Sequence, residues 1–468
     1  MPLKKGRALE SGANQGTFVV VDLGKTVSKI SVWSRDGRMV DRRLRATAPL
    51  VVEGTRRLDI GSVAVWLVEV LKEFSAHPIE TIVPVGHGAA VVALAGDRLA
   101  FCPLDYEQAL PDGLNFGAQI YWLEQLHPEI EVTTLLPWAQ YWAWFLTGNA
   151  VSEVTSLGCH SDVWAPDSGT FSPMAQRLGW ADRFAPVVGA AQVVGTIKPD
   201  IAAATGLSPA VKVLAGLHDS NAALLAARGF PEIACNDATI LSTGIWFIAM
   251  RLAAEQLTTA TLDETRDCLV NVDTYGHAVP SARFMGGREI ESVIGIDTRR
   301  VDIKPDQPAL LAMVPDIVRQ GIMLLPTLAP GCGPFPTHAA RWIGEPADGP
   351  TDWYARRAAV SLYAALVADT SLDLIGARDR LLVEGRFADA EVFVRALAAL
   401  RPHTAVYTAN AHNDVSFGAL RLINPDLVPQ GSLTRVEPLE IDLAPYRSRW
   451  LSEIADIDRT ILAGRAYP

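Results

Sequence analysis

The chain has 468 residues, of which 49% are hydrophobic and 20% are charged. This is the composition of a well-packed globular protein and not of a disordered one, and the length predicts two or three domains. The formal net charge of -11 argues against a nucleic-acid binder, which normally presents a basic face. It does not argue against phosphate ligands, because those need only local donors.

The cysteines are scattered along the chain, at positions 102, 159, 235, 268 and 332. Their spacing offers neither a zinc knuckle nor a C-x-x-C redox pair, and an odd, scattered set indicates reduced thiols and a cytoplasmic protein. Residues 1–16 contain no apolar core segment, so we expect a loose extension there and no signal peptide. No run reaches the roughly 18 apolar residues of a membrane span, so no membrane partner is expected.

The first predicted element is a hairpin over residues 18–33. An apolar run leads to Asp22, Gly24 and Thr26, and a second run of alternating polar and apolar residues follows. This pattern predicts a strand, a tight turn and a second strand. Such a turn can hold a phosphate on its N–H groups and a metal ion near its carboxylate. An ordinary hairpin that exposes Asp22 is the alternative.

The tripeptide Gly24-Lys25-Thr26 also resembles the end of a Walker A loop. That loop needs a further glycine five residues before Gly24 and a helix after the threonine. Position 19 is Val19, and the residues that follow the threonine are strand-like. The sequence therefore disfavours a P-loop.

A polar residue between two glycines follows the next predicted strand. Residues 60–74 show helical spacing of apolar side chains, and residues 79–85 are predicted to be a buried strand that leads to His87. Another strand is expected over residues 89–94. Folds of the α/β class place ligand groups at the ends of strands, so His87 is a candidate for a substrate site. The alternative is a loop histidine that satisfies backbone groups.

A second candidate site comes at the end of a later strand. Residues 133–147 carry aromatic side chains at helical spacing and are predicted to form a core helix. A short strand over residues 211–214 then leads to His218 and Asp219, and a helix follows over residues 222–227. Helix N–H groups would help to hold the Asp219 carboxylate. A helix N-cap is the alternative for Asp219, and His218 can either bind a hydroxyl group or pack.

The second half of the chain opens in the same way as the first. After a linker at residues 229–232, residues 238–250 again predict a strand, a small polar turn and a strand. This is a structural echo of residues 18–33 and not a sequence repeat. Two such halves that face each other would clamp a nucleotide between two domains.

Further elements follow, and the segment after Gln430 gives no structural prediction. The predicted elements are a helix from Glu289 after Gly286, a Pro/Gly-rich loop over 326–336, a long helix over 353–375, a strand over 380–383 that ends at Glu384 and Gly385, a helix over 390–400, a short strand over 405–407, and a last helix over 416–422.

These landmarks, in this order, resemble the FGGY family of carbohydrate kinases, of the actin, hexokinase and heat-shock ATPase superfamily. The resemblance covers roughly residues 17 to 425, and the wording of its motifs is similar to the rhamnulokinase-like side of the family. The motifs are Asp22-Leu23-Gly24-x-Thr26, Gly216-Leu217-His218-Asp219-Ser220, Leu241-Ser242-Thr243-Gly244-Ile245-Trp246, Leu324-Leu325-Pro326 and the Glu384-Gly385 strand end.

The resemblance implies an α/β fold with two ribonuclease-H-like, actin-like ATPase domains and a nucleotide and sugar cleft between them. Residues 17–229 would form the N-terminal domain, with the sugar site, the first phosphate loop and the catalytic aspartate. Residues 230–430 would form the C-terminal domain, with the second phosphate loop and the adenosine site. Residues 1–16 and 431–468 would be extensions. The family habit favours a homodimer.

The resemblance also implies an activity, the phosphorylation of a sugar hydroxyl by ATP with Mg²⁺. Asp219 would be the general base, and Asp22 would hold the Mg²⁺ ion. The nucleotide would be bound by Gly24, Lys25, Thr26, Thr243, Gly244, Gly286 and Gly385, and the sugar would face His87, Gly88 and His218.

Departures from the family pattern, which include an altered acidic start of the long helix, leave the substrate open. Lys25 stands where the family usually has threonine or serine, and it would either contact the γ-phosphate or point to solvent. The Gly-rich adenosine loop is reduced to residues 383–386. The family's Trp-x-Asp-x-Arg sugar motif is absent, and residues 104–107 occupy its region.

We therefore expect a ketose, such as a pentulose or deoxyhexulose, or a polyol as the substrate. Two other functions stay open. One is a non-catalytic member that binds ATP or sugar, which the presence of both Asp22 and Asp219 disfavours. The other is an ATPase or chaperone-like relative, which the lack of a visible peptide-binding domain disfavours.

Overall fold

The structure is a computed structural model that describes residues 16–465 except 89, 106–115, 160, 255–261, 299 and 410–414, with side chains described up to residue 455. The chain divides into two compact units. We call residues 1–226, 272–276 and 413–429 the N-terminal unit, and residues 227–271, 277–412 and 430–468 the C-terminal unit. The chain first crosses between the units close to the predicted boundary at residue 229, but residues 272–276 and 413–429 return to the N-terminal unit.

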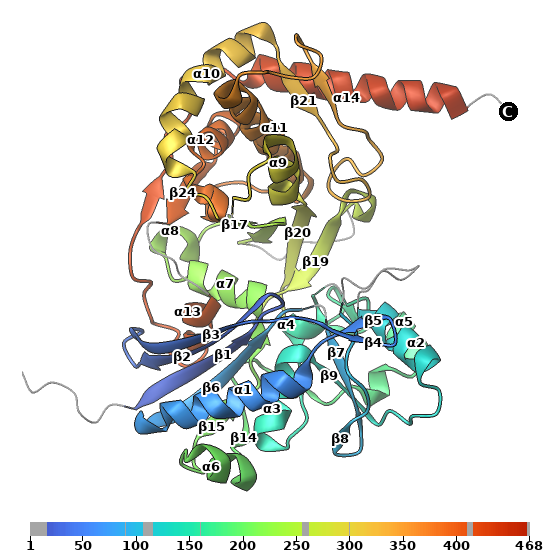
Figure 1. Ribbon diagram of the computed structural model, residues 1–468, viewed down its shortest axis with the longest axis vertical. Helices are drawn as coiled ribbons and strands as arrows, with labels where there is room; N and C mark the ends of the chain where they lie inside the picture. Colours follow the sequence, from blue (N-terminus) through green and yellow to red (C-terminus); the bar gives the residue numbers. More distant parts are fainter. Residues whose placement is uncertain are drawn as a thin grey trace, which may run out of the picture. The chain divides into compact units, whose positions relative to one another are not determined.

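A mixed sheet with strand order β14-β15-β6-β1-β2-β3 forms the centre of the N-terminal unit (Figure 1). Strand β1 runs antiparallel to β2 and parallel to β6, and β15 and the short β16 also run parallel to β6. The predicted hairpin over residues 18–33 is therefore confirmed. The strands are β1 (Thr17–Leu23), β2 (Val27–Ser34), β3 (Met39–Ala46), β6 (Ile79–Gly86), β14 (Val193–Thr196), β15 (Lys212–Leu214) and β16 (Leu217–His218).

Helices cover both faces of this sheet, which explains why every residue of β1 is buried. Successive side chains of a strand point to opposite faces. Val19 and Val21 pack with helices α1 (Ile60–Glu73) and α3 (Trp138–Thr147), whereas Val20 packs with α7 (Asp219–Ala227) and α13 (Val415–Leu420). The apolar run before Asp22 thus anchors the hairpin from both sides.

Smaller elements complete the N-terminal unit, with β7 between β8 and β9 in a separate small sheet. These elements are β4 (Leu50–Val52), β5 (Thr55–Arg57), η1 (Phe74–Ala76), β7 (Val91–Ala95), β8 (Arg98–Leu99), α2 (Phe116–Leu126), β9 (Thr134–Pro137), β10 (Ser152–Glu153), α4 (Val154–Leu157), β11 (Trp164–Ala165), β12 (Thr170–Phe171), α5 (Pro173–Arg177), η2 (Ala181–Arg183), β13 (Val187–Val188) and α6 (Pro199–Thr205).

The C-terminal unit is built on a second mixed sheet, with strand order β19-β20-β18-β17-β23-β24-β25. Its first hairpin, β17–β18, is antiparallel, and β17 also runs parallel to β23, as β1 does to β6. The predicted echo of the opening hairpin is confirmed. The strands are β17 (Ala238–Thr243), β18 (Phe247–Leu252), β19 (Cys268–Val272), β20 (Ala278–Phe284), β23 (Arg380–Gly385), β24 (Ala405–Ala409) and β25 (Leu433–Arg435).

The long helix α11 (Trp353–Leu374) is the core of the C-terminal unit and was predicted to within one residue. It contacts α9, α10 and α12 (Figure 1). The remaining elements are α8 (Pro231–Ala234), η3 (Glu264–Arg266), α9 (Gly286–Ile294), η4 (Lys304–Asp306), α10 (Gln307–Gln320), β21 (Met323–Leu325), β22 (Arg341–Ile343), η5 (Arg386–Asp389), α12 (Glu391–Leu400) and α14 (Ala444–Arg465).

The segment predicted as an extension, residues 431–468, instead contributes to the C-terminal unit. Strand β25 pairs with β24 at the edge of the sheet. Helix α14 docks beside β21, where Tyr446 Oη donates to Ile322 O at 2.6 Å and Trp450 Nε1 donates to Leu324 O at 2.8 Å. Buried Trp450 and Tyr446 are spaced four residues apart, the signal that the charged surroundings hid.

Two other predictions are corrected by the structure. Residues 133–147 are not one helix, because β9 occupies Thr134–Pro137 and α3 begins at Trp138. Pro137 is the N-cap of α3, as expected for a residue whose fixed φ suits a helix boundary. The expected linker at residues 229–232 runs into the short helix α8, with Pro231 at its first turn.

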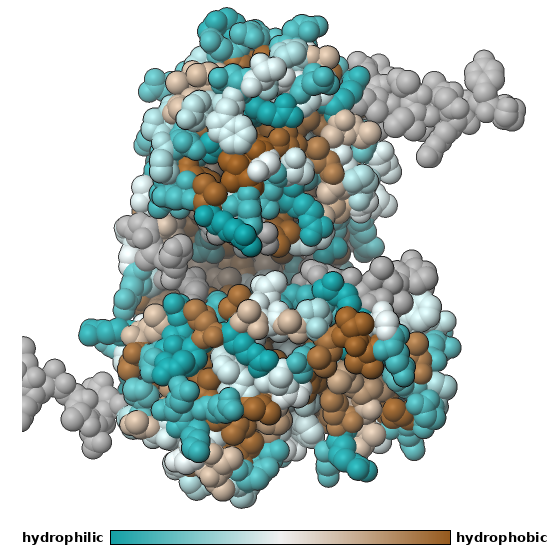
Figure 2. Space-filling view, in the orientation of Figure 1, coloured by the Kyte–Doolittle hydropathy of each residue, from teal (hydrophilic) through white to brown (hydrophobic). Residues whose placement is uncertain are grey.

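Exposed apolar side chains of the N-terminal unit lie on β2, β3 and β4: Val27, Met39, Val40, Leu44, Leu50, Val51 and Val52. Figure 2 shows apolar residues interspersed with polar ones on the surface of this unit. Among the described residues, no helix combines the length and the hydrophobicity that crossing a bilayer requires.

Candidate active site

Three parallel strands bring the predicted site residues of the N-terminal half together. Strands β1 and β16 both run parallel to β6, with Asp22 opposite Val85 and His218 opposite Gly86. The carboxyl ends of parallel strands meet at one edge of a sheet, the usual place for ligands in α/β folds. Asp22, His87 and Asp219 therefore lie at the same edge of the sheet, each at or just after a strand end.

The turn between β1 and β2 is fixed by contacts on either side. A Cβ atom at Gly24 would lie 2.7 Å from the carbonyl oxygen of Val27, so the turn accepts only glycine without a shift. Trp138 Nε1 donates to Leu23 O at 2.9 Å, and Thr47 N donates to Thr26 O at 2.9 Å. The phosphate-competent turn is thus held rigidly.

Both lysines of the hairpin form ion pairs. Lys29 faces Asp22 across the strands, with 3.1 Å between Nζ and the buried Oδ2. Lys25 pairs with the fully buried carboxylate of Asp105, which also lies 3.4 Å from Arg56 Nη2. Only 12% of the Lys25 side chain is exposed, so the alternative in which Lys25 points to solvent is wrong for this structure.

Asp219 is the first residue of α7, directly after β16. Its Oδ1 accepts from the backbone N of Ser220 at 2.6 Å and lies 3.0 Å from His218 Nε2. Burial raises the pKa of a carboxylate, but the neighbouring His218 outweighs that effect, so the pKa of Asp219 is lowered. Asp219 is therefore ionised at neutral pH, with 30% of its side chain exposed.

His218 is buried, and protein groups surround both ring nitrogens. Nε2 lies 3.0 Å from Asp219 Oδ1 and 3.3 Å from Cys159 Sγ, while Nδ1 lies 3.3 Å from Asn221 Nδ2. Burial lowers the pKa of an imidazole, yet the electrostatic effect of Cys159 and the ion pair with Asp219 together raise the pKa of His218 well above its ordinary value. The structure thus directs this ring toward the carboxylate.

Glu153 is a buried acid behind this pair that the sequence reasoning missed. Its Oε2 accepts from Thr155 Oγ1 at 2.6 Å and from Ser156 N at 3.2 Å, which caps α4. Thr155 Oγ1 in turn accepts from the backbone N of His218 at 3.0 Å. Burial raises the pKa of Glu153 to about 7. A glutamate directly before a short helix was the available signal.

His87 and Gly88 follow β6 and adjoin His218. Burial lowers the pKa of His87 to about 4, so its imidazole is neutral at pH 7. A Cβ atom at Gly88 would lie 2.4 Å from Cys159 Sγ and 2.7 Å from His218 Nε2. Any larger residue at position 88 would displace Cys159, the His218 ring or both.

The predicted nucleotide residues of the second half lie around the end of β17. Gly385 has φ of +88° at the end of β23, and a Cβ atom there would lie 2.3 Å from the carbonyl oxygen of Thr243. The Thr243 hydroxyl donates to Glu384 O and accepts from Phe387 N at 3.1 Å. Thr243 thereby joins β17 to the Gly385 turn.

The start of α9 packs against the turn that follows Thr243. Gly244 N donates to Trp246 O at 2.9 Å, and Gly287 N donates to Ile245 O at 3.2 Å. A Cβ atom at Gly287 would lie 2.0 Å from Gly244 O, and one at Gly286 would lie 2.7 Å from the Phe247 ring. Gly244, Gly286 and Gly385 are therefore brought together, beside a helix N-terminus that favours anions.

Arg386 occupies the position where the family's glycine-rich loop continues. Its Nη1 donates to Thr298 Oγ1 at 2.8 Å and lies 3.1 Å from Glu291 Oε1. Arg386 therefore ties η5 to the segment at and beyond α9. The departure from the glycine-rich pattern adds a brace next to Gly385.

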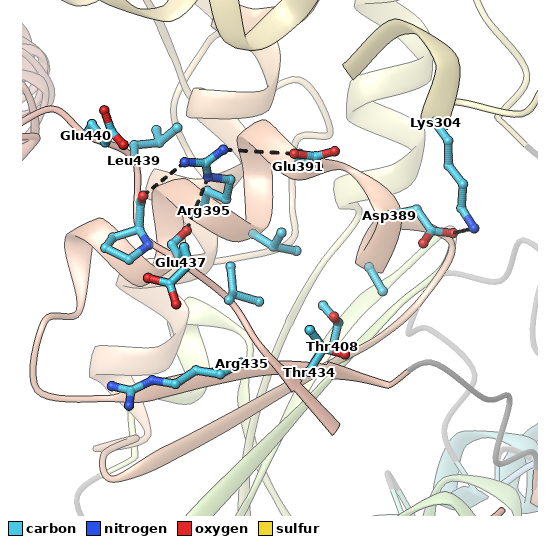
Figure 3. Close-up of a pocket in the computed structure, with 14 residues that line it drawn as sticks. Lys304, Asp389, Glu391, Arg395, Thr408, Thr434, Arg435, Glu437, Leu439 and Glu440 are labelled. Carbon is cyan, nitrogen blue, oxygen red and sulfur yellow. Dashed lines mark hydrogen bonds and ion pairs between the residues drawn. The ribbon is translucent and has the colours of Figure 1, made fainter. Parts of the chain in front are cut away.

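A hollow of about 780 Å³ adjoins η5 on the C-terminal unit (Figure 3). Asp389, four residues after Gly385, lies at one end of it, and Asp389 Oδ2 lies 3.3 Å from Lys304 Nζ (Figure 3). Glu437, Leu439 and Glu440 lie toward the other end (Figure 3). Its volume is in the range of small-molecule sites.

A magnesium site in this protein would depend on a single carboxylate. Among the described residues, no group of three or more His, Cys, Asp and Glu side chains is placed to hold a metal ion. Mg²⁺ bound to a nucleotide needs only one or two protein carboxylates, because phosphate oxygens and water supply the other ligands. Asp22, a carboxylate beside the phosphate-competent turn, fits that requirement.

Two family models match this chain, one in each half. The N-terminal domain of the FGGY family of carbohydrate kinases matches residues 112–226, and the C-terminal domain of carbohydrate kinase FGGY matches residues 235–430. The chain belongs to the FGGY family of carbohydrate kinases. The predicted α/β fold with two domains of the actin-like ATPase type is confirmed.

Individual relatives agree with this assignment. The chain is 64% identical to a carbohydrate kinase from Novosphingobium aromaticivorans, with a TM-score of 0.88 over 93% of this chain and 99% of that one. It shares the fold of a xylulose kinase from Lactobacillus acidophilus, with 13% identity and a TM-score of 0.79 over 96% and 99% of the two chains. It is also 31% identical over 190 residues to L-fuculokinase of Salmonella typhi, and that match spans 37% of each chain.

Proposed function

We propose that the protein transfers the γ-phosphoryl group of ATP to a hydroxyl group of a sugar, with Asp219 as the general base. The observation that carries this proposal is the geometry of Asp219, an ionised carboxylate held at the carboxyl edge of the N-terminal sheet. Membership of a carbohydrate kinase family supports the choice of acceptor.

Asp219 has one oxygen for positioning and one for chemistry. The contacts with Ser220 N and His218 Nε2 both involve Oδ1. Oδ2 is then the oxygen that accepts the proton as the sugar oxygen attacks the phosphorus atom. Phosphoryl transfer depends mainly on positioning and electrostatics, so a carboxylate that orients the hydroxyl suits the reaction.

Asp22 and the two turns would bind the nucleotide. Asp22 would hold Mg²⁺, and the ion would neutralise charge on the phosphate oxygens. In the N-terminal unit the phosphates would contact Gly24, Lys25 and Thr26. In the C-terminal unit the nucleotide would contact Thr243, Gly244, Gly286 and Gly385 through backbone N–H groups and the close approach that glycines permit.

His87 and Gly88 would face the sugar. Neutral His87 can both donate and accept hydrogen bonds, which suits recognition of hydroxyl groups. The expected substrate is a ketose, such as a pentulose or deoxyhexulose, or a polyol. The name of the Salmonella relative makes L-fuculose the first deoxyhexulose to test.

The release of ADP with and without a panel of sugars tests the proposed function. We expect release that depends on one ketose or polyol. Sugar binding without turnover would favour the non-catalytic alternative. ADP release at the same rate with and without sugar would favour an ATPase. Either result would contradict the proposal.

Lys25→Met is expected to act on both stability and ATP use. The substitution leaves the buried Asp105 carboxylate without this cation, and breaking a buried ion pair costs about 3 kcal/mol. Calorimetric unfolding should show the loss, and Lys25→Met with Asp105→Asn should recover most of it. If Lys25 also contacts the γ-phosphate, the variant with both substitutions still lacks that contact, and its KM for ATP stays above the wild-type value. A wild-type KM there would assign Lys25 to structure alone.

Asp389→Ala is expected to raise the KM for ATP and to leave the KM for sugar unchanged. We propose that the adenosine lies against Gly385 and reaches the end of the hollow at which Asp389 lies (Figure 3). Loss of one hydrogen bond predicts an increase of about two- to tenfold. Glu440→Ala, at the far end of the same hollow, is the matched control. Equal effects of both variants would contradict this placement.

A further inference from the structure

We infer that His218 is a positioning residue for the base and not a sugar ligand. The inference rests on the proposed function of Asp219. Three observations support it. His218 Nε2 lies 3.0 Å from Asp219 Oδ1, only 6% of the His218 side chain is exposed, and the ring is held on its other side by Asn221. A ring so enclosed presents little surface to a sugar, but it fixes the carboxylate.

His218 is held through its backbone as well as through its side chain. Its backbone N donates to Thr155 Oγ1 at 3.0 Å, and that hydroxyl donates to Glu153 Oε2 at 2.6 Å. At the ring, Nε2 lies 3.0 Å from Asp219 Oδ1 and 3.3 Å from Cys159 Sγ. The orientation of the imidazole is therefore determined from several directions.

Asn221 completes the arrangement. Its Nδ2 lies 3.3 Å from His218 Nδ1, and its buried Oδ1 has no hydrogen-bond partner among the described residues. An amide can be turned end for end, because its oxygen and nitrogen are assigned from their partners. In the turned orientation Oδ1 accepts from a protonated Nδ1, so Asn221 satisfies an imidazolium whose Nε2–H donates to Asp219.

This arrangement has a consequence for the pH dependence of catalysis. The imidazolium opposes the effect of burial and keeps the pKa of Asp219 low. The other titratable groups around the pair are His87, Cys159 and Glu153, with Lys25 and Asp105 acting on His87. Without the imidazolium, burial raises the pKa of Asp219. The base then becomes protonated at a higher pH.

The test compares His218→Gln, His218→Leu and Asp219→Asn across pH 5 to 9. Glutamine can place an N–H near the position of Nε2 but carries no charge, whereas leucine offers no donor. We expect His218→Leu to lower kcat by about 10²-fold, the cost of a misplaced catalytic group. We expect His218→Gln to keep much of kcat at pH 8, and its acid limb to move up by about one pH unit or more. The KM for ATP should stay at the wild-type value in both.

His77→Gln is the matched control, because His77 precedes β6 at the opposite end of the strand from the site. The unfolding temperature of each variant reports folding, and His218→Gln carries the test if His218→Leu does not fold. A raised KM for sugar with wild-type kcat and an unmoved acid limb would overturn the inference in favour of a sugar contact. Near wild-type turnover of Asp219→Asn would instead reject the proposed base, so the two failures are distinguishable.

Discussion

Asp219→Asn is expected to lower kcat by about 10²- to 10⁴-fold, the range for removal of a general base. An amide cannot accept the proton of the sugar hydroxyl, although its oxygen can still accept from Ser220 N. The fold and the KM for ATP should therefore stay near their wild-type values. Steady-state kinetics with the best sugar of the panel, together with ATP titration, would measure both.

Ser220→Ala is a useful control for this variant, because it keeps the backbone N–H that donates a hydrogen bond to Asp219 Oδ1. We expect its kcat to exceed that of Asp219→Asn by a large factor. Turnover of Asp219→Asn within a few-fold of wild type would remove Asp219 from the role of base. The reaction would then need another group to orient the hydroxyl.

Gly216→Ala is expected to destabilise the N-terminal unit and to disturb the base. Gly216 has φ of +76°, and a Cβ atom there would lie 2.0 Å from the carbonyl oxygen of Pro84. The positive φ alone costs about 1–2 kcal/mol for alanine. The overlap with backbone adds to this cost and must shift β6 or the segment that carries His218 and Asp219. A shift of about 1 Å can reduce kcat by about 10²-fold.

Gly54→Ala isolates the conformational part of that cost. Gly54 has nearly the same φ, +77°, but nothing lies within 4 Å of a Cβ atom built there. We expect Gly54→Ala to lose only the cost of the positive φ and to keep its activity. Denaturant unfolding of both variants would show the difference. Equal decreases in the free energy of unfolding would mean that the close approach of Gly216 to Pro84 does not contribute to the cost of Gly216→Ala.

Local patterns in the sequence predicted most of the elements that carry the site. The apolar run before Asp22 and the strand before the glycines around His87 each marked a strand end. The strand expected over residues 211–214 is β15, whereas the short strand β16 that carries His218 was not predicted. Parallel pairing with β6 then places these ends at one edge of the sheet. The family resemblance supplied the roles of these residues, which the strand pattern alone left open between ligand groups and structural ones.

Contacts between distant segments could not be predicted in this way. Cys159 and Thr155 approach His218 across about sixty residues of chain, and Lys25 meets Asp105 across 80. Nothing in the local pattern around Lys25 favours Asp105 over solvent or phosphate. The partner is chosen by the packing of β1 and β2 against a loop from another part of the unit.

In α14 the sequence contains a helical pattern of apolar residues, but the charged residues around it concealed the pattern. The buried residues Tyr446, Trp450 and Ile454 recur every four positions. Tyr106 and Glu107, considered with Asp105 as a replacement for the family's sugar motif, lie outside the described residues. Ala89, the first residue of the strand expected after His87, also lies outside them.

The most direct test of the proposed function is the stoichiometry of the reaction. With the sugar that stimulates ADP release, mass spectrometry of the products should show one sugar phosphate for each ADP. Asp219→Asn should form neither product at a comparable rate. ADP formed with free phosphate and no phosphorylated sugar would contradict the proposal and would identify the protein as an ATPase.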